Sequence, residues 1–196
     1  MRSVTRTLTA AAAAALTGAL IALARGVRQP GALLPGDRLV RAPVATRTMS
    51  AWFPAAPDAV WPWLAQMGAG RAGWYGVDLI DNGGEASADH IVPELQRIVP
   101  GDELAASTFG GPPFVVAQAV EDRALVMVLR SARGRLRTSY AYVLAPQAGG
   151  TRLTARLRMG GRPALGALLA APLVLAGHEA GQRIQFLRLR RRISPR

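Results

Sequence analysis

The chain has 196 residues and no cysteine, and its 24 basic residues, all arginine, outnumber its 12 acidic residues. This length accommodates one domain of about 150 residues with an appendage, and it is too short for two full domains. The lack of cysteine excludes disulfides, cysteine nucleophiles, iron–sulfur clusters and cysteine-based zinc sites.

The positive charge is concentrated in the C-terminal part of the chain. Residues 1–122 contain 9 Arg and 11 Asp or Glu, whereas residues 123–196 contain 15 Arg and one acid, Glu179. Such an excess predicts anionic surroundings, with a merely solvated outer face as the alternative. We expect an anionic membrane surface rather than nucleic acid, because the basic strands lack interleaved exposed aromatic residues.

Residues 1–25 form an apolar N-terminal segment. Leu8–Ala24 is a run of 17 residues without charge, with arginines on both sides. Its length is at the lower limit for a membrane span, and its alanines insert only weakly. We therefore predict a membrane anchor, with a cleaved signal peptide ending at Ala22-Leu23-Ala24 and a soluble helix as alternatives. The protein is accordingly expected to be membrane-associated, or secreted if the segment is cleaved.

Residues 26–43 contain three prolines and three glycines, which predicts an extended linker before a domain over 44–193. Residues 44–53 are rich in β-branched residues and predict the first strand. Pro57-Asp58 begins a short amphipathic helix that Gly68 ends, and Pro62 is expected to delay or kink it.

Residues 69–100 are rich in Gly, Asp and Pro and predict loops and helical turns, where functional residues often gather. Five strands are predicted after them, separated by turn residues: Glu103–Thr108, Phe114–Glu121, Ala124–Ser131, Arg135–Leu144 and Thr151–Met159. In the last two, apolar residues alternate with arginines, so one sheet face is apolar and the other cationic.

The region from Pro163 to Arg192 predicts a C-terminal helix, in which Pro172 and Gly177 are unusual residues, with Ile184, Leu187 and Phe186 on its apolar side. The whole order predicts an α+β helix-grip fold, in which a curved antiparallel sheet wraps around this helix, behind an N-terminal apolar helix. Incomplete closure between sheet and helix leaves a concave apolar space, a default ligand site.

Residues 34–130 resemble a bacterial branch of the SRPBCC (START-like) superfamily. The resemblance rests on these motifs: Leu34-Pro35-Gly36-Asp37, Val60-Trp61-Pro62-Trp63-Leu64, Gln66-Met67-Gly68, Arg71-Ala72-Gly73-Trp74-Tyr75, Asp81-Asn82 and Ile91-Val92-Pro93-Glu94-Leu95-Gln96. The superfamily includes lipid-transfer domains, polyketide cyclases and the birch pollen allergen, so the resemblance implies the fold more firmly than any chemistry. It implies binding or carriage of a lipid-like or polyketide-like molecule, with a cyclase or dehydratase as the alternative.

The predicted ligand contacts come from the loop region and from the inward side of the strands. Trp74 and Tyr75 lie in a glycine-rich loop and are expected to gate the cavity, whereas Trp61 and Trp63 are expected in the core. The full predicted ligand-binding set is Met67, Trp74, Tyr75, Leu125, Met127, Leu129, Tyr140 and Tyr142.

Under the enzyme alternative, the candidate proton-transfer residues are Tyr75, Asp78 and His90, with Asp81 and Glu94 as further acids. Structural roles compete for each of them. The sequence lacks a phosphate-binding loop and a nucleophile elbow, and its two histidines are far apart in the chain. We therefore predict no cofactor and no metal, and the oligomeric state is open.

Overall fold

The computed structural model describes residues 33–131, 136–161 and 165–194. The apolar segment 1–25 lies outside these residues, so the predicted anchor or signal peptide stays a prediction. Within the described part of the chain, no helix is both long enough and apolar enough to cross a membrane.

A six-stranded antiparallel sheet forms the centre of the fold, in the order β1-β6-β5-β4-β3-β2. Its strands are β1 (Pro43–Phe53), β2 (Glu103–Leu104), β3 (Phe114–Val120), β4 (Ala124–Arg130), β5 (Leu136–Gln147) and β6 (Gly150–Gly161). Consecutive strands β2 to β6 pair as a meander, and β1 closes the sheet against β6. The long strands correspond to the predicted ones within a few residues.

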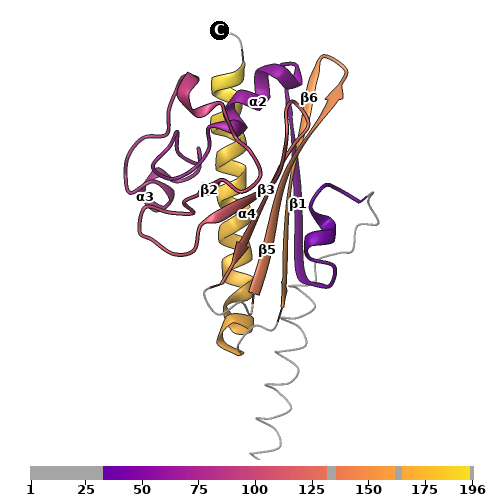
Figure 1. Cartoon of the computed structure of the whole chain (residues 1–196), viewed down its shortest axis with the longest axis vertical. Helices are drawn as coiled ribbons and strands as arrows, with labels where there is room; N and C mark the ends of the chain where they lie inside the picture. The colour runs from indigo at the N-terminus through magenta and orange to yellow at the C-terminus, as the bar shows by residue number, and fades with distance from the viewer. Residues whose placement is uncertain (1–32, 132–135, 162–164, 195–196) are drawn as a thin grey trace, which may run out of the picture.

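The helix α4 (Leu165–Ile193) runs along one face of the sheet (Figure 1). Its contacts with β1 include an edge-on packing of Phe186 against Phe53 at 6.3 Å between ring centroids. The predicted combination of an antiparallel sheet with a long C-terminal helix packed against it is confirmed, and the helix continues through positions 172 and 177.

The buried side of α4 agrees with the prediction at Phe186, which is 7% exposed, and differs from it at Leu187, which is 60% exposed. The buried residues of the helix are Leu175, Gln182, Gln185, Phe186, Leu189 and Ile193. The prediction was wrong at Leu187 because it followed the apolar residues alone, whereas two buried glutamines complete the stripe that faces the core.

Short elements connect β1 to the meander: α2 (Pro57–Ala65), α3 (Asp78–Asp81) and η2 (Pro93–Leu95). The helix α2 runs through Pro62 and buries Trp61 and Trp63, which confirms their place in the core. The predicted strand Glu103–Thr108 is wrong beyond Leu104. The carbonyl of Ala105 accepts hydrogen bonds from Ala69 N and Trp74 Nε1, so the chain leaves the sheet there and joins the loop.

The other face of the sheet is partly covered by residues 34–42. Within the predicted linker, Asp37–Leu39 forms a 3-10 helix, η1, on the opposite side of the sheet from α4 (Figure 1). Asp37 is 4% exposed and accepts a hydrogen bond from Arg156 on β6 at 2.8 Å, while Arg158 donates to the carbonyl of Val40. Two of the outward arginines are therefore paired within the domain.

Candidate functional site

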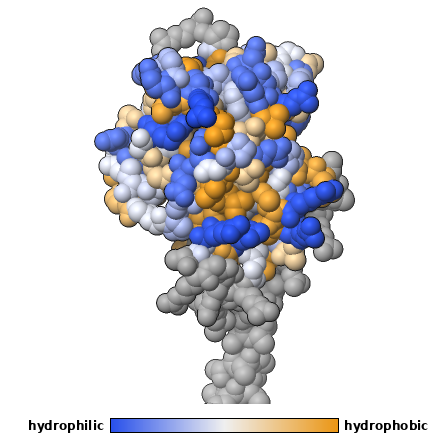
Figure 2. Space-filling model, viewed as in Figure 1, coloured by the Kyte–Doolittle hydropathy of each residue, from blue (hydrophilic) through white to orange (hydrophobic). Residues whose placement is uncertain are grey.

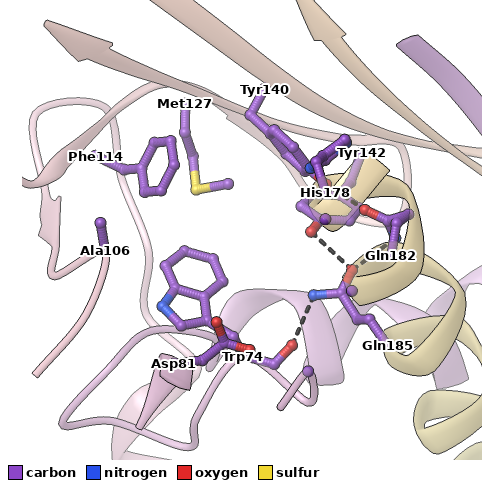
Figure 3. A pocket seen from close by; sticks show the side chains of 13 residues that line it. Trp74, Asp81, Ala106, Phe114, Met127, Tyr140, Tyr142, His178, Gln182 and Gln185 are labelled. Atoms are coloured by element: carbon purple, nitrogen blue, oxygen red, sulfur yellow. Dashed lines mark hydrogen bonds between the residues drawn. The ribbon is translucent and has the colours of Figure 1, made fainter. Parts of the chain in front are cut away.

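A cavity of about 220 Å³ lies between α4, the inner face of the sheet and the loop that carries α3. The inner strands β3, β4 and β5 supply one wall, and α4 supplies the facing wall (Figure 3). Its lining residues are Trp74, Gly76, Asp81, Ala106, Phe114, Met127, Tyr140, Tyr142, Gly177, His178, Gly181, Gln182 and Gln185.

Aromatic rings and a thioether make up the apolar side of the cavity. The rings of Trp74 and Phe114 meet edge to face with centroids 5.6 Å apart, and Phe114 meets Tyr140 at 6.3 Å. Met127 stands beside Phe114 on the neighbouring strand (Figure 3). Since Trp74 Nε1 donates to the carbonyl of Ala105 at 3.1 Å, the indole is held in place as a wall of the cavity.

A hydrogen-bonded network makes up the polar side. Tyr140 donates its hydroxyl hydrogen to Gln182 Oε1, and Tyr142 donates to Gln185 Oε1 at 2.8 Å. Gln182 Nε2 also donates to Gln185 Oε1 at 2.7 Å, and Gln185 Nε2 donates to the carbonyl of Trp74 at 2.6 Å. Among the described residues, no buried side-chain nitrogen or oxygen lacks a partner. Such a satisfied network fixes the helix relative to the strand and to the loop.

Two ionisable side chains on this lining are left available to a ligand. Asp81 uses one carboxylate oxygen to accept from Val77 N at 2.7 Å, and within the described residues it forms no ion pair. Desolvation raises the pKa of Asp81. His178 packs edge-on against Tyr140 at 5.4 Å, and burial lowers the pKa of its imidazole, which is therefore neutral at pH 7.

Glycines on α4 leave room for the cavity. Gly177 and Gly181 are one helical turn apart and both line it. A Cβ atom added at either position would meet nothing within 4 Å. Ordinary side chains at these positions would occupy the space that is now open.

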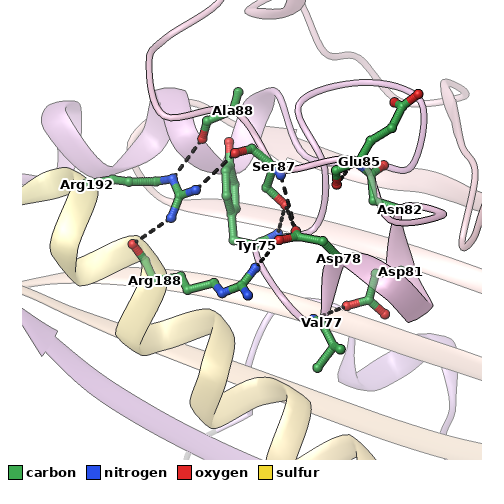
Figure 4. Close-up of polar contacts among 10 residues, drawn as sticks. All are labelled: Tyr75, Val77, Asp78, Asp81, Asn82, Glu85, Ser87, Ala88, Arg188 and Arg192. Atoms are coloured by element: carbon green, nitrogen blue, oxygen red, sulfur yellow. Dashed lines mark hydrogen bonds and ion pairs between the residues drawn. The ribbon is translucent and has the colours of Figure 1, made fainter.

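The loop on the far side of the cavity is held to α4 by arginines (Figure 4). Arg188 pairs with Asp78, which also accepts the hydroxyl hydrogen of Ser87 at 2.6 Å. Arg192 donates to the carbonyls of Ser87 and Ala88 and lies 5.3 Å from the ring centroid of Tyr75. Asp78 therefore ties the loop to the helix and does not line the cavity.

The structure places the eight predicted ligand contacts in two groups. Trp74, Met127, Tyr140 and Tyr142 line the cavity. Of the others, Met67, Tyr75 and Leu125 lie in the core, fully buried, and Leu129 is half-buried near the end of β4; none of these four is on the lining.

The three predicted proton-transfer residues are not brought together. Tyr75 is buried, and its hydroxyl accepts a hydrogen bond from Gln66 at 2.7 Å. Asp78 pairs with Arg188, and His90 is exposed beside Asp89. Among the described residues, no group of three or more histidines and acids is arranged to hold a metal.

The polar residues of α4 are the functional candidates that the sequence analysis missed. His178, Gln182 and Gln185 recur at i, i+4 and i+7, the spacing of one helix face, inside a stretch read only for its apolar residues. This spacing was a usable signal, because polar residues on a helix face that packs against a sheet need partners.

No family model matches the sequence, and no curated protein matches it. Solved structures do resemble the fold. Protein MLL2253 from Mesorhizobium loti is 15% identical, with a TM-score of 0.50 over 76% of this chain and 96% of that one. Protein NE0264 from Nitrosomonas europaea is 14% identical, with a TM-score of 0.50 over 76% and 93%.

CalU16 from Micromonospora echinospora also matches, at 12% identity and a TM-score of 0.40, over 74% of this chain and 83% of that one. At that score the likeness carries no functional argument. The similarities show that the fold is shared with known bacterial proteins.

Proposed function

We propose that the protein is a member of the SRPBCC superfamily that binds a small, mainly apolar molecule in the cavity between α4 and the sheet. The observation that carries the proposal is the cavity itself, with rings on one side and a fixed polar network on the other. Ligand pockets combine these two features, since apolar walls supply affinity and a few polar groups set orientation.

Apolar residues on the segments around the cavity also favour this function. Asp81 of α3 and Ala106 of the loop after β2 line the cavity. The two segments are joined by a hydrogen bond from Ser107 Oγ to the carbonyl of Ile80 at 3.2 Å. Leu79, Ile80 and Phe109 on the same two segments are 72%, 63% and 76% exposed. Hydrophilic side chains surround apolar surface on the face shown in Figure 2. An apolar molecule that approaches these segments therefore meets apolar contacts before it reaches the cavity.

The volume narrows the class of ligand. About 220 Å³ corresponds to roughly seven water molecules at ~30 Å³ each. This is below the usual range of about 300–1,000 Å³ for drug-sized ligands. A molecule with one or two rings fits within this space, whereas a two-chain lipid would extend out of it. Of the lipid-like and polyketide-like ligands that the sequence predicted, ring compounds are favoured.

The residues proposed for the enzyme alternative are not gathered at the cavity. Tyr75 bonds to Gln66, Asp78 pairs with Arg188, and His90 is exposed. A general acid or base must reach the bound substrate. Binding is therefore the function that the arrangement supports best.

Blocking the cavity tests the proposal. In Gly181→Leu, the new side chain extends into the cavity from α4. Ala180→Leu places the same leucine side chain at an exposed neighbouring position. We expect the full-length wild type and Ala180→Leu to bind 2-phenylethanol in ligand-observed NMR, and Gly181→Leu to lose most of this binding. Native mass spectrometry of protein from its own host would identify any co-purified ligand.

Equal binding by all three proteins would show that the probe sits elsewhere. A wild type that does not bind 2-phenylethanol and carries no co-purified molecule would refute the proposed function.

A further inference from the structure

The charged groups around the cavity are unusual for so basic a chain. None of the arginines within residues 33–131, 136–161 and 165–194 is among the lining residues. Among the residues that the structure describes, Asp81 is the one acid on the lining and His178 is its one histidine. A carboxylate or phosphate ligand would therefore meet a carboxylate and lack a cationic partner in the cavity.

The nearby ions outside the lining are already paired. Arg188 lies against Asp78, and Arg47 bonds to Glu179 at 2.8 Å. The two members of each pair act with opposite signs on the lining: Asp78 and Arg188 on the pKa of Asp81, and Glu179 and Arg47 on the pKa of His178. Asp81 itself forms no ion pair within the described part of the chain, and one oxygen of its carboxylate accepts no hydrogen bond there.

We propose that the ligand of this cavity carries a protonated amine, which pairs with Asp81 while the rings of Trp74, Phe114 and Tyr140 pack around it. This inference rests on the proposed function and names the class of ligand. Aromatic rings attract a cation through the negative electrostatic potential of their faces, and a carboxylate completes such a site. The combination is present here on the lining of one cavity, with Asp81 and Trp74 both drawn at its lower side in Figure 3.

The neighbouring groups are compatible with a cation. Because burial lowers the pKa of His178, its imidazole is neutral at pH 7 and accepts a hydrogen bond without repelling an ammonium group. The raised pKa of Asp81 reflects poor solvation of its carboxylate, which a bound cation would relieve. Both shifts agree with the geometric argument.

The net charge of +12 opposes this ligand only weakly. Exposed arginines act over distances that salt screens, with a Debye length of about 8 Å at physiological ionic strength. A carboxylate in direct contact inside a partly desolvated cavity is screened much less. The local group therefore decides the sign of the ligand.

Three probes of similar size and different charge test the inference on the full-length protein: 2-phenylethylamine, 2-phenylethanol and phenylacetate. We expect the wild type to bind the amine at least about tenfold more tightly than the alcohol, and the acid most weakly. In Asp81→Asn, the amide oxygen still accepts from Val77 N, so the turn is retained. This variant should lose about tenfold in affinity for the amine and little for the alcohol.

Asp58→Asn is the matched control, because it removes one negative charge at an exposed position on α2 away from the cavity lining. Its affinities should equal those of the wild type. If the alcohol or the acid binds the wild type as tightly as the amine, the amine inference is wrong and the proposed function stands. If folded Asp81→Asn binds the amine with unchanged affinity, the amine inference is likewise wrong and the proposed function stands. Should this variant not fold, the order of the three probes on the wild type decides.

Discussion

The three tyrosines of the chain, Tyr75, Tyr140 and Tyr142, are all buried, and each is hydrogen-bonded to a glutamine. Desolvation raises the pKa of Tyr75 to about 12 and raises the pKa values of Tyr140 and Tyr142 further. Tyr140 and Tyr142 therefore present neutral phenols to the cavity throughout the physiological range, and their hydroxyls position Gln182 and Gln185 of α4. Tyr75 lies off the lining and bonds to Gln66.

A pH titration of tyrosinate absorbance checks that the buried tyrosines stay protonated. Between about pH 9 and about pH 11, we expect little tyrosinate to form in the folded protein, whereas the chain unfolded in denaturant should titrate near pH 10. Because the folded state keeps these protons to higher pH, its free energy of unfolding should fall as the pH rises above about 10. A tyrosinate step near pH 10 under native conditions would show that one of these phenols is solvated.

At the residue scale, the strand contacts of the site were predictable and the helix contacts were not predicted. Met127, Tyr140 and Tyr142 alternate with outward residues, so a period of two assigns them to the inner face. Tyr75 follows a glycine-rich turn that predicts exposure, yet it has a φ of 57° and its ring points into the core against Trp63. Loop side chains lack such periodicity, and their direction depends on contacts distant in sequence.

At the scale of elements, α4 combines a packed C-terminal half with open space at Gly177 and Gly181. Glycine is a poor helix former, since it loses more backbone freedom on folding than alanine does. Two glycines spaced one turn apart on the cavity side therefore reduce helix stability and leave room against the sheet. The open space at these positions agrees with a ligand-binding role for this end of the helix.

Replacing these glycines by alanine tests whether they reduce the stability of the helix. Since an added Cβ meets nothing within 4 Å, Gly181→Ala should raise the free energy of unfolding by about 0.5–1 kcal/mol. Denaturant titration measures the change, and Gly177→Ala should behave alike. A loss of stability would mean that the backbone of α4 lies closer to the strands than the structure shows.

At the scale of the whole molecule, the segment Gly36–Val40 attaches the N-terminal side of the chain to the outer face of the sheet. A Cβ at Gly36 would lie 2.6 Å from Val126, and one at Gly160 would lie 2.5 Å from Val40, so the segment packs closely. The side chain of Asp37 is 3% exposed and pairs with Arg156 and Arg158. Residues 36–40 are thus held at a defined place on the outer face of the sheet.

Asp37→Asn should loosen this attachment. Removing one partner of a buried ion pair typically costs about 3–5 kcal/mol. Here Arg156 and Arg158 keep 12% and 16% side-chain exposure, so we expect a loss of about 2–4 kcal/mol in the free energy of unfolding. Trypsin should also cleave faster after the exposed Arg38 and Arg41 under native conditions.

The exposed Asp58→Asn serves again as the control, because it removes an equal charge without breaking an ion pair among the described residues. Both proteins should be compared by denaturant titration and by native proteolysis. Equal stability of the two variants would show that the Asp37 pairs contribute nothing beyond ordinary surface electrostatics.

The sequence by itself determined the class of the fold. Alternation with a period of two marked the strands, turn residues separated them, and a long apolar C-terminal stretch predicted the helix that covers the sheet. These features are local, so neighbouring residues suffice to specify them. Only the tertiary structure decided which side chains meet at the cavity and how residues 36–40 attach to the sheet. Asp81 reaches a cavity shared with His178, and Asp37 pairs with Arg156, because packing brings together residues about one hundred positions apart, for which local patterns hold no information.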